Sequence, residues 1–94
     1  MQLATVIGSV WSTRKEDRLV GMKLMLVKPI NVLDEEMDII PIIAVDTIGA
    51  GIGETVIVVK GSSARSVVGD HSSAIVDAAI VGIVDDREVD KRYL

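Results

Sequence analysis

The sequence predicts a mainly β protein, folded as one small five-stranded barrel with a short helix. The apolar residues, 49% of the 94-residue chain, are mostly Val, Ile and Ala, with no Phe, one Trp and one Tyr. β-branched side chains are stiff at χ1 and suit pleated, half-buried surfaces. Short apolar runs alternate with turn signals, and closing such strands into a barrel removes most exposed sheet edges.

Five apolar segments of strand length follow one another along the chain. They cover residues 2–11, 22–28, 39–45, 54–60 and 78–84. Gly8 marks a bulge or close approach in the first segment. Pro41 cannot donate to a β-ladder, so the third segment should lie at an edge or a bulge. The polar stretch 12–21 ends in glycine and is expected to be a connection.

Residues 61–68, GSSARSVV, are the only plausible helix. Ser62 or Ser63 would cap it and Gly69 would end it. About two turns are too short to be stable without tertiary packing. We expect a barrel over residues 1–86 and a charged C-terminal tail over residues 87–94, mobile or docked on a partner.

Composition argues against several classes of function. The formal net charge is −4 and the sequence pI is about 4.8, which disfavours binding to nucleic acid or to anionic lipid. Aromatic residues are 2% of the chain and cysteine is absent, so stacking platforms and thiolate metal sites are not expected. No basic leader precedes an apolar run, and no run approaches the roughly 18 residues of a membrane span. We expect a soluble intracellular protein.

No catalytic, cofactor or metal residue is predicted, so the chain is not expected to be an enzyme. The spacing from Gly49 to Gly53 is G-x-G-x-G before a strand, whereas a dinucleotide site needs G-x-G-x-x-G before a helix. The acidic stretch 31–38 lacks the turn glycine of a calcium loop. A trio of Ser62 or Ser63 with His71 and Asp77 lacks a nucleophile elbow.

The strands are apolar on both of their faces. Residues 55–59, 24–27 and 78–84 show no alternation of polar and apolar side chains. Strands of this kind are buried on both faces, and one short helix cannot cover the outside of three strands. Mean hydropathy is also high, at +0.44. We therefore expect other copies of the chain to cover the barrel in a closed cyclic ring. Bulges and loops folded over the barrel are the alternative.

The stretch 46–65 is a candidate contact segment, which a phosphate, a nucleic acid or another copy of the chain could approach. Glycines allow backbone from a neighbour to come close, and small side chains at the GSSAR turn do the same. An ion pair between Asp46 and Arg65 would suit such a contact, with Asp77 as the alternative partner of Arg65; two exposed charges are the other interpretation. The predicted interface residues are Asp46, Gly49, Ala50, Gly51, Gly53, Ser62, Ser63 and Arg65.

The string AVDTIGAGIGETVIVVKGSSAR, residues 44–65, resembles the EutN/CcmL/PduN family of bacterial microcompartment vertex proteins. Near the start, the family pattern T-x-K followed by L-x-G-x-K-L-L-V is met by Thr13, Lys15, Leu19, Gly21, Lys23 and Leu24, with Met25 in place of the second leucine. The strand DAAIVGIVDD, residues 77–86, is similar to the family's last strand.

The resemblance implies an OB-like barrel, although here the helix follows the fourth strand rather than the third. It also implies a homopentamer that caps the vertices of a polyhedral shell among hexameric shell proteins in the cytoplasm. No catalysis, cofactor, nucleic acid or membrane is implied. The alternative is a small OB-like binding module for nucleic acid or a small ligand.

Overall fold

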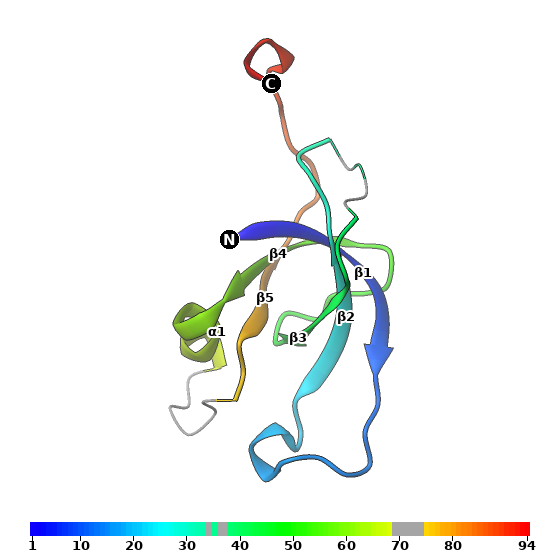
Figure 1. Cartoon of the computed structure of the whole chain (residues 1–94), viewed down its shortest axis with the longest axis vertical. Coiled ribbons are helices and arrows are strands. Elements are labelled where there is room, and N and C mark those ends of the chain that lie inside the picture. Colours follow the sequence, from blue (N-terminus) through cyan, green and yellow to red (C-terminus); the bar gives the residue numbers. More distant parts are fainter. Residues whose placement is uncertain (34, 36–37, 69–74) are drawn as a thin grey trace.

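A computed structural model describes residues 1–33, 35, 38–68 and 75–94. The described residues form five strands and one α-helix (Figure 1). The strands are β1 (Gln2–Val10), β2 (Lys23–Pro29), β3 (Ile42–Asp46), β4 (Thr55–Lys60) and β5 (Ala78–Ile83), and the helix is α1 (Gly61–Val68). Single 3-10 turns cover Asp17–Leu19 and Lys91–Tyr93.

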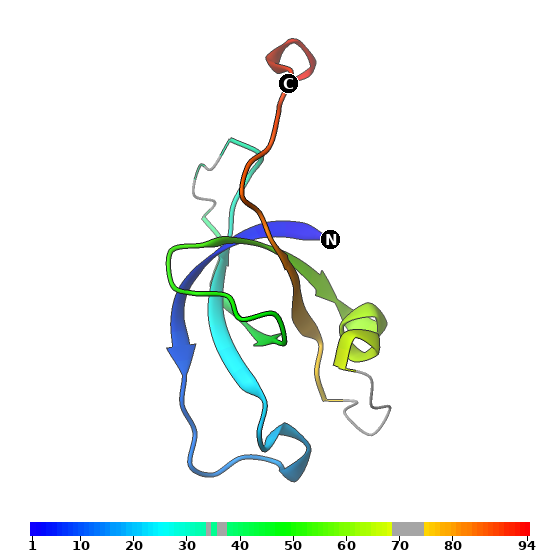
Figure 2. The ribbon, with the colours of Figure 1, turned by 180° about the vertical axis from the view of Figure 1, so that it is seen from behind.

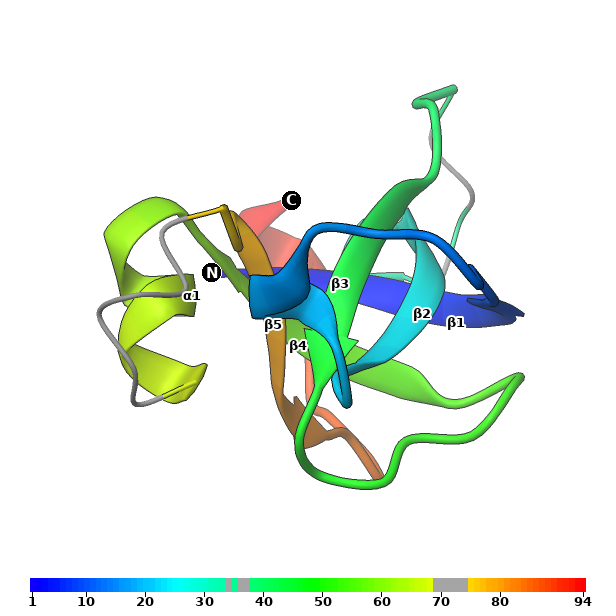
Figure 3. The same cartoon turned by 90° about the horizontal axis from the view of Figure 1, so that it is seen from below.

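The strands close into a barrel in the order β1-β2-β3-β5-β4 (Figure 3). Neighbouring strands are antiparallel, except that β3 and β5 are parallel and pair only at Val45–Ala79 and Asp46–Ile80. The helix lies between β4 and β5 and packs on both. This mixed five-stranded barrel of the described residues confirms the predicted fold class.

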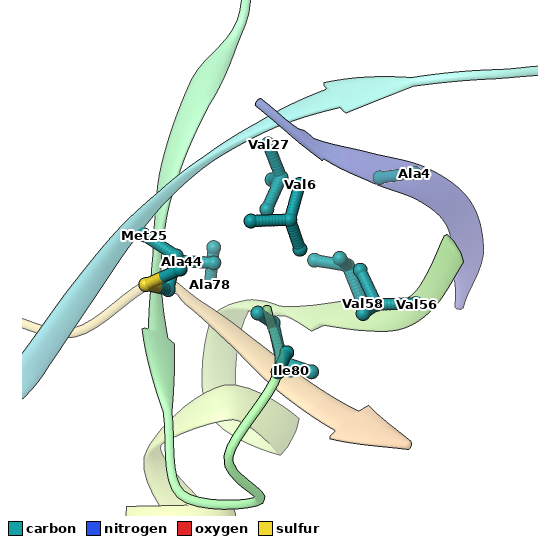
Figure 4. Close-up of a cluster of buried hydrophobic side chains, with 10 residues drawn as sticks. Ala4, Val6, Met25, Val27, Ala44, Val56, Val58, Ala78 and Ile80 are labelled. Carbon is teal, nitrogen blue, oxygen red and sulfur yellow. The ribbon is translucent and has the colours of Figure 1, made fainter. Parts of the chain in front are cut away.

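Small and β-branched side chains, together with Met25, fill the narrow interior of the barrel. Alternate residues of each strand point inward and lie toward one another (Figure 4). These residues are Ala4, Val6, Met25, Val27, Ala44, Val56, Val58, Ala78 and Ile80. A second cluster forms outside the barrel, where Ala64 of α1 packs on Val45, Val59, Val76 and Ala79.

Single residues set the boundaries and irregularities of several elements, and some of these differ from the predictions. β3 begins at Ile42, directly after Pro41, because proline has no N–H for the ladder. Of the two alternatives expected at Gly8, the structure shows a bulge beside it: the register of β1 shifts between Val6 and Gly8, and Gly8 itself pairs with Leu26. The predicted cap is wrong: α1 begins at Gly61, so Ser62 and Ser63 lie in its first turn. Its expected end, Gly69, lies outside the described residues.

The chain beyond β5 extends away from the barrel (Figures 1 and 2). The molecule is therefore elongated, with principal extents of 48, 23 and 22 Å. The Val84 amide still donates to the Thr55 carbonyl at 2.8 Å, and Arg87 Nε donates to the Val32 carbonyl at 2.6 Å. The division into a barrel and a tail stays a prediction. Within the described residues, no helix is long and apolar enough to span a membrane.

Candidate subunit interface

Asp46 folds the glycine loop around its own carboxylate. Its Oδ1 accepts hydrogen bonds from the amides of Ile48 at 2.9 Å and Gly49 at 3.0 Å, and its Oδ2 accepts one from Ala50 at 2.8 Å. The carboxylate has no exposed surface. An Asp that accepts from the amides following it forms an Asx-type turn, which fixes the backbone directly after β3. Ala50 is 1% exposed and fills the core beneath the loop.

Lys23 joins this loop to the start of β2. Its Nζ lies 3.3 Å from Asp46 Oδ2 and donates to the Ala50 carbonyl at 3.3 Å. Burial raises the pKa of Asp46, but the three backbone amides and Lys23 outweigh it, so the pKa lies below its usual value. The carboxylate is therefore charged at neutral pH while it holds the loop.

The second half of the loop is closed by Glu54. The Gly51 amide donates to Glu54 Oε1 at 2.6 Å. The Gly53 amide donates to the Val6 carbonyl at 2.8 Å, and the Val6 amide donates to the Glu54 carbonyl at 3.0 Å. These bonds attach the end of the loop to β1.

The three loop glycines are required for two different reasons. Gly49 and Gly53 have φ of +99° and +92°, which side chains rarely adopt. Gly51 has ordinary φ, but a Cβ there would lie 3.1 Å from Glu54 Oε1. The fold of the single chain thus accounts for these glycines without a neighbour.

The loop does not offer a site for phosphate. A phosphate cradle needs successive backbone N–H groups that point at the ligand. Here the carboxylates of Asp46 and Glu54 occupy the amides of residues 48–51, and they would repel an anion. No group of three or more potential metal ligands exists in the described part of the chain. His71, the central member of the rejected catalytic trio, lies outside that part.

The helix presents a different surface. Ala64 is buried, whereas Ser62 and Ser63 are exposed and Arg65 is half-buried. The Arg65 side chain makes no ion pair or hydrogen bond with the described residues. The predicted Asp46–Arg65 pair is therefore wrong within the chain, because Asp46 is paired with Lys23. Asp46 is not an exposed charge either, since the residue is 6% exposed.

The outside of the molecule carries many exposed apolar side chains. Ile43 on β3 is 49% exposed, and Ile48 and Ile52 in the glycine loop are 49% and 69% exposed. Large apolar side chains scattered singly over a surface are ordinary, whereas neighbouring exposed ones, such as Ile48 and Ile52 in one loop, mark a candidate contact site. The other large apolar residues exposed by a third or more are Met1, Ile7, Trp11, Val20, Val32, Leu33, Ile39, Ile40, Val67, Ile75, Tyr93 and Leu94.

Sequence reasoning missed the side chains that hold the loop in place, Lys23 and Glu54. Lys23 stands 23 residues before its partner, and no local pattern connects the two. Glu54 follows Gly51 by three residues, the spacing of a side chain that turns back to a nearby amide. That spacing could have predicted the hydrogen bond between Glu54 and the Gly51 amide.

The comparison with known families identifies the chain. Residues 1–85 match the family described as ethanolamine utilisation protein EutN/carboxysome. The chain belongs to this EutN/CcmL family. It is a family of structural shell vertex proteins of bacterial microcompartments, not of enzymes.

Individual relatives agree over nearly the full length. The microcompartment shell vertex protein PduN of Salmonella typhimurium is 47% identical over 89 residues, which cover 90% of this chain and 96% of PduN. The structure of the GrpN pentameric microcompartment shell protein from Rhodospirillum rubrum has a TM-score of 0.82 and 45% identity, covering 95% of this chain and 100% of GrpN. The structure of CcmL from Gloeobacter violaceus has a TM-score of 0.87 and 38% identity, covering 96% and 91%.

Proposed function

We propose that five copies of this chain close into a ring that caps a vertex of a microcompartment shell. The observation that carries the proposal is the set of large apolar side chains that a single copy leaves exposed, on the strands at Ile7 and Ile43 and in the glycine loop at Ile48 and Ile52. Closed cyclic rings are a common way to cover such a surface. Family membership supports a ring of five, because the GrpN relative is a pentameric shell protein.

The interface is proposed to use two parts of the 46–65 stretch in different ways. Asp46, Gly49, Ala50, Gly51 and Gly53 shape the loop, and its exposed Ile48 and Ile52 then meet a neighbour. Helix α1 contacts the neighbour directly, through the side chains of Ser62, Ser63 and Arg65. A guanidinium with no ion pair or hydrogen bond to the described residues is well suited to bind carbonyl or carboxylate oxygens of another subunit.

The ring would be one component of a mixed shell. We place hexameric shell proteins around its rim, with no nucleic acid, membrane or cofactor involved. The alternative, an OB-like binding module, finds less support. Single-strand binding needs stacked aromatics along a basic groove, and the chain is acidic and 2% aromatic.

Native mass spectrometry tests the ring. One chain has a mass of 10.1 kDa, so a pentamer has a mass of about 50 kDa. We expect that species at micromolar concentration in near-physiological salt. A monomer with affinity for an oligonucleotide would contradict the proposal and favour the binding module.

A further inference from the structure

The C-terminal arm, residues 85–94, has apolar groups that its own barrel does not bury. It leaves the end of β5 and points away from the other strands (Figures 1 and 2). Arg87 bonds to the Val32 carbonyl near the start of the arm, but Tyr93 and Leu94 at its end are 83% and 68% exposed. An aromatic side chain typically buries roughly 150–250 Å² when it finds a partner.

An apolar groove lies at the opposite end of β5. It is lined by Leu19, Leu24, Ile43, Val45, Ile75, Val76, Asp77 and Ala78, and its volume is about 200 Å³. Small-molecule sites usually have volumes of roughly 300–1,000 Å³. The groove is therefore better matched to inserted side chains than to a ligand.

The wall of this groove contains an open strand edge. β3 pairs with β2 from Ile42 to Asp46, but with β5 only at Val45 and Asp46. Among the described residues, no strand pairs with the other edge of residues 42–44. Such an edge presents N–H and C=O groups that an added extended segment can bind. Residues 84–90 belong to no helix or strand, and Asp90 has extended backbone, with φ of −87° and ψ of 103°. The 3-10 turn Lys91–Tyr93 follows it and carries Tyr93.

We propose that the C-terminal arm of one copy lies in the β3–β5 groove of the next copy, with Tyr93 as its anchor. The groove is at the start of β5 and the arm leaves its end in the other direction, so the arm is placed to reach a neighbour's groove. A head-to-tail contact of this type forms a ring when the rotation between successive copies closes. The proposal rests on the ring proposed above and identifies one of its contacts.

Charges at the two sites are complementary. Asp77 is exposed on the groove, and Lys60 lies beside it on the adjoining surface. The arm carries both signs, with Glu88 before the basic residue Lys91. Lys91 can meet Asp77 and Glu88 can meet Lys60 as Tyr93 enters the groove. These rim contacts would orient the arm more than they would strengthen its binding.

Hydrogen exchange of the assembled ring tests the contact. The chain is compared with a variant lacking residues 88–94, which keeps Arg87 and its bond to Val32. We expect the amides of residues 42–44 that point away from β2 to exchange on the order of tenfold faster without the arm, as backbone hydrogen bonds and cover are lost. Trp11→Ser is the control, because it removes another exposed aromatic, 91% exposed, from the β1–β2 connection. It should leave amides 42–44 unchanged.

If the variant lacking residues 88–94 no longer forms a ring, a disulfide cross-link in the longer chain tests whether the arm contacts the groove of a neighbour. The chain has no cysteine, so the single variants Tyr93→Cys and Ile43→Cys can be mixed and oxidised. Disulfide heterodimers, which require Cα atoms within about 7 Å, support the contact. A ring of about 50 kDa with unchanged exchange at 42–44 and no heterodimer overturns the arm contact but leaves the ring standing. A full-length chain that stays monomeric overturns the ring itself.

Discussion

The glycine loop and helix α1 were predicted from sequence as one subunit interface, but they differ in how their polar groups are bonded. The loop is held by hydrogen bonds within the chain, whereas most of the helix is exposed or half-buried. The backbone amides of loop residues 48–51 donate hydrogen bonds to the carboxylates of Asp46 and Glu54 in the same chain. In α1, only Ala64 is buried, and Arg65 has no ion pair within the described residues. Polar groups that bind their own chain maintain its fold, and those left over are available to a partner.

We therefore expect substitutions in the two regions to affect different properties, the stability of the barrel and the assembly of the ring. Substitutions at Asp46 or the loop glycines should be measured mainly as a loss of barrel stability. Substitutions at Ser62, Ser63 or Arg65 should leave the barrel intact and change only the ring.

Asp46→Ala should have the largest effect on the barrel. It removes three hydrogen bonds to a charged acceptor and leaves the buried Ala50 amide without a partner. We expect a loss of about 2–4 kcal/mol in the free energy of unfolding. Urea denaturation measures it, with Asp85→Ala, an exposed carboxylate, as the control. Equal stability of the two variants would show that the carboxylate does not hold the loop.

Gly53→Ala should have the next largest effect. Nothing lies within 4 Å of a Cβ at this position, so the cost comes from the φ of +92° alone. We expect about 1–2 kcal/mol of destabilisation. Gly82→Ala is the matched control, since the backbone φ of Gly82 is ordinary and an added Cβ would lie 3.7 Å from Ile57 Cδ1. If the control were the less stable variant, backbone conformation would not be the reason for glycine at position 53.

Acidification should have a smaller effect, because a protonated carboxyl still accepts hydrogen bonds. The pKa of Asp46 is lower in the folded chain than in the unfolded one. Its stabilisation is therefore complete above the unfolded value near pH 4 and is lost as pH falls through the folded value. Thermal unfolding between pH 6 and pH 2 measures this loss, and Asp46→Asn should flatten the curve. A variant as acid-sensitive as the original chain would assign the effect to other carboxylates.

Gly51→Val should act on both regions. The added Cβ meets the flexible end of Glu54, which can move away at the cost of its bond to the Gly51 amide. We expect roughly 1 kcal/mol of destabilisation and a weaker ring, because the neighbouring Ile52 is 69% exposed and shifts with the loop. Thermal unfolding and native mass spectrometry measure the two effects. An unchanged ring would remove position 51 from the interface proposal.

Most of the fold was accessible from the sequence because its signals are local. Helix α1 was predicted at its observed bounds, and a bulge was one of two alternatives predicted at Gly8. The site was accessible only in part, since its contacts depend on distant residues. Asp46 was expected to pair with Arg65 in the same stretch, whereas the barrel brings Lys23 from β2 to the loop. Likewise, φ at Gly49 and Gly53 could not be distinguished from close packing at Gly51 before the loop geometry was known.

Native mass spectrometry of Arg65→Ala tests the central distinction most directly, because charge states report folding and mass reports assembly. The variant removes a side chain with no ion pair in the described chain, so barrel stability should stay within about 0.5 kcal/mol. At a concentration where the unaltered chain forms the ring of about 50 kDa, we predict a compact, folded 10.1 kDa monomer. An intact ring, or a monomer with the charge states of an unfolded chain, would contradict the account.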